Sequence, residues 1–198
     1  MLSWKYKNEN VYVFLDIDGV LNSRSTHLRI EKHIESNNDI LKCPKIRFAP
    51  WSNPNDFGNY IDEMNLDCLK CLEDLGKIKV ILISSWTSSY NRAMKKKGLT
   101  KDSKDYYKEF SDFFFGIEVI GEIDSTVGDG TIRYKGALDY INKHQLLNSN
   151  DYIVYLDDTH VPYNERDNTV ISYADFSETY GLTYKIIEKI KNHLKSIH

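Results

Sequence analysis

The sequence has few cysteines, no long hydrophobic run and no large excess of charge of either sign. Its three cysteines are too few, and odd in number, for a disulfide framework, so a reducing, cytoplasmic setting is expected. The longest apolar runs, VYVFL and VILI, are far shorter than the roughly 20 residues that span a bilayer, and MLSWKYKNEN lacks the apolar core of a signal peptide. The net charge of −3 excludes a chain-wide basic field, although a local basic patch is compatible with it.

The chain has the length and the apolar content of one globular domain. Its 198 residues, 41% of them hydrophobic, predict a single domain over 1–198. Apolar runs that end abruptly in polar residues predict buried strands at 11–15, 79–85, 152–158 and 168–172, and within 113–123. Helical periodicity predicts helices at 64–75, 86–98, 135–144 and 183–194. This alternation predicts an α/β fold, a parallel sheet with helices on both faces.

Two stretches do not follow the alternation. Residues 23–60 are rich in Pro, Asn, Gly and aromatic residues, and a loop of that length inside a compact domain is usually functional. We therefore expect 23–60 to form a small cap or flap insert. Residues 95–115, after the second strand, are basic and aromatic.

Polar side chains stand where three of the predicted strands end. They are Asp16, Asp18, Ser84, Asp157 and Asp158. The carboxyl ends of parallel strands meet at one edge of a sheet, so these side chains should be neighbours. Four carboxylates at one edge require a hard divalent cation, and Mg²⁺ is the one typically held by carboxylates beside a substrate phosphate. Lys135, at the start of a predicted helix, can supply further positive charge.

Other interpretations of the paired aspartates are weaker. An EF-hand loop needs glycine at its sixth position, where Leu21 stands here, and it does not follow a strand. Asp18 and Gly19 alone could simply form a turn. The turn does not account for the ordered series of strand-terminal serine, helix-initial lysine and YLDD that follows.

That ordered series resembles the haloacid dehalogenase (HAD) superfamily of phosphotransferases. FLDIDGVLN resembles its first motif, VILISS the second, RYKGALDYI the third and YLDD the fourth, over residues 11–22 and 77–195. LISSW and YGLT are similar to the small HAD domains grouped with RNA-repair and polynucleotide kinase-phosphatase proteins. Such relatives often continue the second motif with arginine, where this chain has Thr87, so Arg92 would have to substitute.

The resemblance implies a Rossmann-like fold and a role for each motif residue. Asp16 would attack phosphorus to form an aspartyl-phosphate, and Asp18 would act as general acid and then general base. Asp16, the main chain of Asp18, Asp157 and Asp158 would hold Mg²⁺. Ser84 and Lys135 would hold the phosphoryl oxygens.

The function expected from these residues is Mg²⁺-dependent hydrolysis of a phosphomonoester, with a small phosphorylated metabolite or a nucleotide as substrate and no membrane partner. One alternative is a 3′-phosphatase that acts on nucleic-acid ends in a repair setting. The basic segment 92–108, which includes Tyr106 and Tyr107, is typical of a single-strand groove but equally of a solvated helix end. Another alternative is a catalytically silent HAD-like binding domain.

Overall fold

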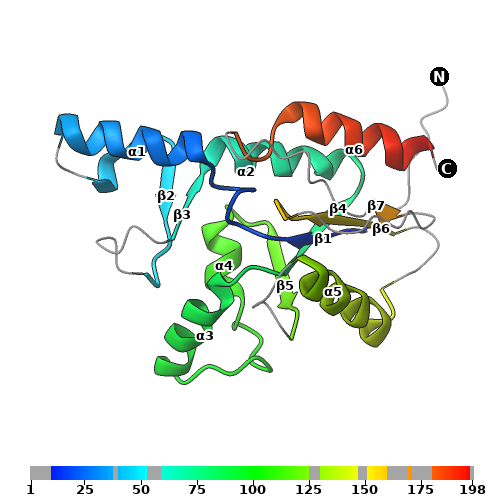
Figure 1. Ribbon diagram of the computed structural model, residues 1–198. Coiled ribbons are helices and arrows are strands. Elements are labelled where there is room, and N and C mark those ends of the chain that lie inside the picture. The colour runs from blue at the N-terminus through cyan, green and yellow to red at the C-terminus, as the bar shows by residue number, and fades with distance from the viewer. Residues whose placement is uncertain are drawn as a thin grey trace.

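A computed structural model describes residues 10–37, 40–52, 59–124, 130–146, 151–159, 169–170 and 180–196. Its centre is a five-stranded parallel sheet in the order β5-β4-β1-β6-β7, and a two-stranded antiparallel sheet of β2 and β3 lies to one side (Figure 1). Helices α2 and α6 run along one face of the large sheet, and α5 covers the other (Figure 1). The predicted α/β class is confirmed.

The strands are short and the helices longer. The strands are β1 (Asn10–Leu15), β2 (Ile46–Phe48), β3 (Tyr60–Asp62), β4 (Lys77–Leu82), β5 (Glu118–Glu122), β6 (Tyr152–Leu156) and β7 (Thr169–Val170). The helices are α1 (Arg24–Asn37), α2 (Glu63–Lys70), α3 (Trp86–Lys96), α4 (Lys108–Phe113), α5 (Gly130–His144) and α6 (Tyr184–Ser196), with short 3₁₀ turns η1 (Ile40–Lys42) and η3 (Cys71–Asp74). None of the helices in these described segments is long and apolar enough to cross a membrane.

The central strand β1 is buried on both of its faces. Val11, Val13 and Leu15 belong to the core formed with α2 and α6, while Tyr12 and Phe14 belong to the core formed with α5. Side chains of a strand alternate between the two faces, so a strand covered by helices on both sides must be apolar throughout. This is why VYVFL carries no polar alternation.

The predicted elements are found, the strand at 168–172 over its described residues 169–170, and α1, the β2–β3 hairpin and α4 are additional. Residues 23–60, expected to be a loop, contain α1 and the β2–β3 hairpin, whose side chains form a small core of their own around Ile30 and Tyr60. Helix α5 begins five residues before the predicted start at 135, and α4 lies within the basic segment. That residues 23–60 act as a cap or flap over the site stays a prediction.

Candidate active site

Three of the four predicted carboxylates meet at the carboxyl edge of the sheet. Asp16 follows β1, and Asp157 and Asp158 follow β6, the strand paired with β1 through Leu15 and Leu156. The main-chain N–H of Asp16 continues that ladder and donates to the Leu156 carbonyl at 2.8 Å. One carboxylate oxygen from each of the three aspartates lies within 4.8 Å of the others. Parallel pairing therefore produces the predicted cluster.

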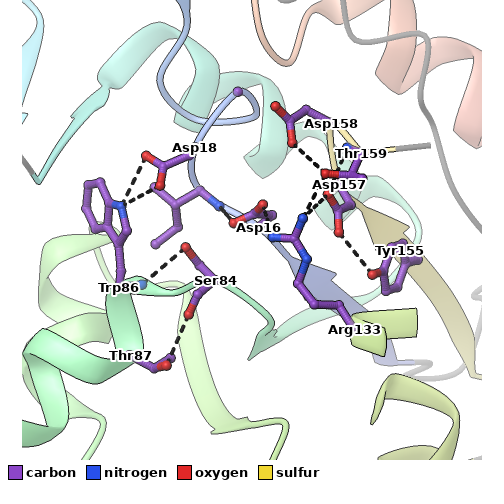
Figure 2. A network of polar contacts seen from close by, with 12 residues as sticks. Asp16, Asp18, Ser84, Trp86, Thr87, Arg133, Tyr155, Asp157, Asp158 and Thr159 are labelled. Carbon is purple, nitrogen blue, oxygen red and sulfur yellow. Dashed lines mark hydrogen bonds and ion pairs between the residues drawn. The ribbon is translucent and has the colours of Figure 1, made fainter. Parts of the chain in front are cut away.

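Arg133 of α5 lies among these carboxylates (Figure 2). Its guanidinium donates to Asp16 Oδ2 at 2.6 Å, to Asp157 Oδ1 at 3.1 Å and to Thr159 Oγ1 at 2.8 Å. Arg133 is not among the site residues that the sequence motifs predict. Ala137 lies one helical turn after Arg133 and is buried against the sheet, so the phase of α5 could have indicated it.

Burial dominates the electrostatics of Asp16. Its side chain is buried, and this raises its pKa to about 7, against the opposing effect of the Arg133 charge. The Asp157 charge raises that pKa further, while hydrogen bonds from the Ile17 N–H and from Ser84 lower it. Burial alone would lower the pKa of Arg133, but Asp16 and Asp157 outweigh it, so the arginine stays protonated. The guanidinium is the cation that these buried carboxylates require.

Asp157 is held in place on two sides. Tyr155 donates its hydroxyl to Asp157 Oδ2 at 3.0 Å, and the Thr159 N–H donates to Oδ1 at 2.9 Å. Asp158 is only partly buried, and its pKa is raised by burial and by the neighbouring Asp157 charge.

Asp18 is oriented away from this cluster. Both of its carboxylate oxygens accept from the Trp86 indole N–H at 3.1 Å, and Oδ1 also accepts from the Asn22 amide at 2.9 Å. Figure 2 shows the side chain turned toward Trp86 rather than toward Asp16. The structure thus places Asp18 beside the site, with two positioning partners that the sequence did not indicate.

Ser84 occupies the position that was predicted for it. It follows β4, is fully buried and supplies the hydrogen bond to Asp16 noted above. Thr87, where the resembling proteins often have arginine, is buried and donates its hydroxyl to the Ser84 carbonyl at 3.0 Å. The side chain of Thr87 therefore supports the loop after β4. Arg92 is exposed on α3.

Lys135 lies apart from the carboxylates. It is exposed, and it lines a cavity between β5 and α5. Successive helical residues are rotated by about 100° around the helix axis, so residues that are two positions apart face nearly opposite directions. Arg133 points to the aspartates, and Lys135 consequently points elsewhere.

The basic segment 92–108 is only partly available to a ligand. Lys95, Lys96 and Lys97 are exposed at the end of α3, and Lys97 forms an ion pair with Glu109. Tyr106 is buried, and its hydroxyl donates to Asn91 at 2.6 Å. A stacking surface made by both tyrosines, as the sequence suggested, is therefore not present in this structure.

The carboxylate cluster is suited to a hard cation. Its donors are all carboxylate oxygens, Asp16 and Asp157 are buried, and the three side chains converge from two adjacent strands. Mg²⁺ prefers such oxygen ligands. The residues present fit Mg²⁺, and Asp16, Asp157 and Asp158 are the side chains that would hold it.

The parallel sheet, the acidic cluster at its carboxyl edge and the strand-terminal serine define an α/β domain with a polar site at the carboxyl ends of its strands. The family model described as "HAD domain in Swiss Army Knife RNA repair proteins" matches residues 12–185, and the chain belongs to this family. Among curated proteins and solved structures, none matches the chain significantly. The predicted HAD and RNA-repair grouping is confirmed, and it supports a hydrolase of the phosphatase type at the level of the superfamily.

Gly19 permits the close approach of the two loops that carry the aspartates. Its φ is +74°, and a Cβ added there would lie 2.7 Å from the Cβ of Asp158 and still closer to its carboxylate. Gly98 has a similar φ of +76° but nothing within 4 Å of an added Cβ. Substitution of either glycine would therefore strain the backbone, but only substitution of Gly19 would also produce a steric clash.

We expect Gly19→Ala to lower the melting temperature more than Gly98→Ala, and to weaken Mg²⁺ binding because Asp158 must move. Gly98→Ala should show only the strain of a left-handed alanine, roughly 1–2 kcal/mol. Thermal unfolding of both variants with and without Mg²⁺ measures each effect. Equal losses in the two variants would show that the approach of Asp158 to Gly19 is unimportant.

Proposed function

We propose that this protein is a Mg²⁺-dependent phosphomonoester hydrolase that acts through an aspartyl-phosphate. The observation that carries the proposal is the convergence of Asp16, Asp157 and Asp158 on one another at the sheet edge, with Ser84 beside Asp16. A buried carboxylate next to a hydroxyl donor and a strong cation has the surroundings that a nucleophile attacking a phosphoryl group needs.

Asp16 is the proposed nucleophile. The Ile17 N–H donates to its Oδ1 at 2.7 Å, and Oδ2 accepts from Arg133. These two contacts, one to each oxygen, fix the orientation of the carboxylate plane. Attack by one carboxylate oxygen forms a bond to phosphorus while the bond from phosphorus to the leaving oxygen breaks, and water then hydrolyses the acyl phosphate.

Asp18 is the proposed general acid for the leaving oxygen, and afterwards the general base for water. Trp86 and Asn22 hold its carboxylate to one side of Asp16 (Figure 2). Proton delivery therefore requires the side chain to rotate out of these hydrogen bonds. Trp86 and Asn22 act as positioning residues that determine how readily it does so.

Ser84 and Arg133 are proposed to stabilise the phosphoryl oxygens at Asp16. Arg133 replaces Lys135, the residue that the sequence motif indicated, because its guanidinium already lies on the nucleophile while Lys135 faces the neighbouring cavity. Asp16, Asp157, Asp158 and the main chain of Asp18 would hold Mg²⁺, which when bound neutralises charge on the phosphoryl group. Arg133 can exchange its carboxylate partners for phosphoryl oxygens, since guanidinium binds both in the same planar manner.

The family match favours one class of substrate. Domains of this family occur in RNA-repair proteins, so a phosphorylated nucleic-acid end or a nucleotide is favoured over an unrelated metabolite. The catalytically silent alternative is disfavoured, because a binding module has no need of a proton donor at Asp18.

Activity should require Mg²⁺ or Mn²⁺ and should disappear with EDTA, because the clustered carboxylates repel a phosphate dianion. Ca²⁺ should inhibit, because its longer bonds and higher coordination number misplace the carboxylates. Steady-state turnover of nitrophenyl phosphate with each ion measures this. Full turnover in metal-free buffer would be incompatible with the mechanism.

Asp16→Asn should abolish turnover of every substrate, whereas Asp18→Asn should depend on the leaving group. General acid catalysis is worth about 10²–10⁴-fold and matters most when the leaving oxygen is strongly basic. The Asp18 variant should therefore lose far more kcat/KM on an alkyl phosphate than on nitrophenyl phosphate. Partial misfolding lowers kcat/KM on both esters alike and therefore cancels in this ratio. Equal losses on both esters would show that Asp18 is not the general acid.

If the lysines at the end of α3 contact a nucleic-acid backbone, Lys95→Glu, Lys96→Glu and Lys97→Glu together should weaken binding of a 3′-phosphorylated oligonucleotide. The salt dependence of binding should also become shallower, because fewer counterions are released. Nitrophenyl phosphate turnover is the control and should hardly change. Equal effects on both substrates, or none on either, would count against backbone contact.

A further inference from the structure

A cavity of about 460 Å³ opens beside the proposed active site, between β5 and α5. Ligand pockets for small molecules are usually roughly 300–1,000 Å³, so its size suits a nucleoside. Residues Ile120–Glu122 of β5 form one wall, Lys135 and Tyr140 of α5 contribute to another, and Lys101 and Tyr107 are among the other lining residues. Among the described residues, none of these lining side chains forms a hydrogen bond or ion pair with Asp16, Asp157 or Asp158. The cavity is therefore separate from the carboxylate cluster.

Glu122 is the unusual group in this cavity. Its side chain is only 4% exposed, and Oε1 accepts from the Asn91 amide at 2.8 Å and pairs with Lys101. Its other oxygen, Oε2, is buried without a hydrogen-bond partner among the described residues. A buried acceptor without a partner is costly, so Oε2 calls for a hydrogen-bond donor that the described residues do not supply.

The cation that pairs with the Glu122 carboxylate belongs to a residue that a ligand could displace. Lys101 belongs to a surface segment between α3 and α4, and its side chain is 53% exposed. A ligand that donates hydrogen bonds can therefore replace its ammonium at the carboxylate while the lysine turns to solvent. The ligand should carry N–H donors on one edge.

The remaining walls favour a flat ring that carries polar edges. A Cβ on Gly121 would lie 3.1 Å from Tyr140 Cζ and closer to the hydroxyl, so the glycine lets the tyrosine ring approach the strand. Tyr140 is also stacked on His144 at 4.1 Å, which keeps its ring rigid. Lysines and acidic residues both line the cavity, so it is not a site for a simple anion.

The cavity lies at the edge of the sheet that carries the aspartates. Glu122 pairs with Leu82, two residues before Ser84, and β4 alone separates β5 from β1. Two strand spacings are about 9–10 Å, which one nucleotide unit can span. A ligand in the cavity can therefore present an attached phosphoryl group toward Asp16.

From these observations we infer that the cavity binds the base of the substrate nucleotide, and that Glu122 selects bases with an amino group. This inference rests on the proposed phosphatase function for the placement of the phosphoryl group. Cytosine, adenine and guanine offer an amino donor to a carboxylate, as cytosine N4 does to Glu in DNA recognition. Uracil offers one N–H between two carbonyl oxygens, which a carboxylate repels.

The location is tested on the wild-type protein by amide NMR, with cytidine and uridine as probes. Cytidine should shift the amide resonances of Gly121, Glu122 and Gly136, and uridine should shift them only at much higher concentration. This measurement depends neither on turnover nor on the folding of any variant. Cytidine shifts that leave all three residues unaffected would overturn the inference, even if nitrophenyl phosphate is hydrolysed. Shifts without phosphatase activity would instead reject the proposed function and keep the base site.

The selectivity is tested with Glu122→Gln, which keeps the shape of the side chain and an oxygen for Asn91. The ratio of kcat/KM for cytidine over uridine 3′-phosphates should be about tenfold in the wild type, the discrimination of one good base contact, and near one in the variant. Glu118→Gln, on the same strand but paired with Lys77 at the other end, is the matched control and should keep the wild-type ratio. An unchanged ratio in Glu122→Gln would contradict the assignment. The same comparison on 3′-phosphorylated oligonucleotides distinguishes the base of an RNA end from that of a free nucleotide.

Discussion

The site depends on the compensation of buried like charges. Asp16 and Asp157 follow adjacent strands and are both almost fully buried, and one carboxylate in such a pair can remain charged only if a cation is close. Arg133 provides that cation, with one nitrogen on each carboxylate. The parallel pairing that joins β1 to β6 is what brings the charges together, so the same hydrogen bonds that form the sheet also create the need for the arginine. A divalent ion bound by these carboxylates would meet the same electrostatic requirement.

The loop after β1 is fixed by contacts that leave little freedom to the aspartates. The Ile17 carbonyl accepts from the N–H groups of Val20, Leu21 and Asn22, which curls the chain directly after Asp16. Asn65 of α2 donates to the Val20 carbonyl at 3.1 Å and so ties this loop to the helix behind it. The main chain that carries Asp16 is thereby held in one conformation, and groups held in place in advance are the usual source of electrostatic stabilisation in enzymes.

The sequence was sufficient to predict the sheet and the carboxylates, because both follow from short-range patterns. Uninterrupted apolar runs such as residues 11–15 predict buried parallel strands, and the polar residues after them must share an edge. Helix α1 was missed because its sequence, RSTHLRIEKHIESN, is mostly polar and sits among loop-forming residues. Its apolar contacts come from the hairpin β2–β3, which joins it only in the folded chain.

The basic residue that pairs with the carboxylates was harder to identify from the sequence. Arg133 and Lys135 are only two positions apart, and the predicted helix start at 135 excluded Arg133. Once α5 is seen to begin at Gly130, Ala137 and Ile141 define the face on the sheet, and Arg133 lies on that same face one turn earlier. Lys135 then necessarily faces the cavity with Glu122. One helix thus presents a cation to the carboxylates and another to the neighbouring cavity, and its rigidity fixes the distance between the two. Under the proposed function, a substrate that contacted both cations would have to match that distance, so the phase of α5 would influence substrate shape as well as charge compensation.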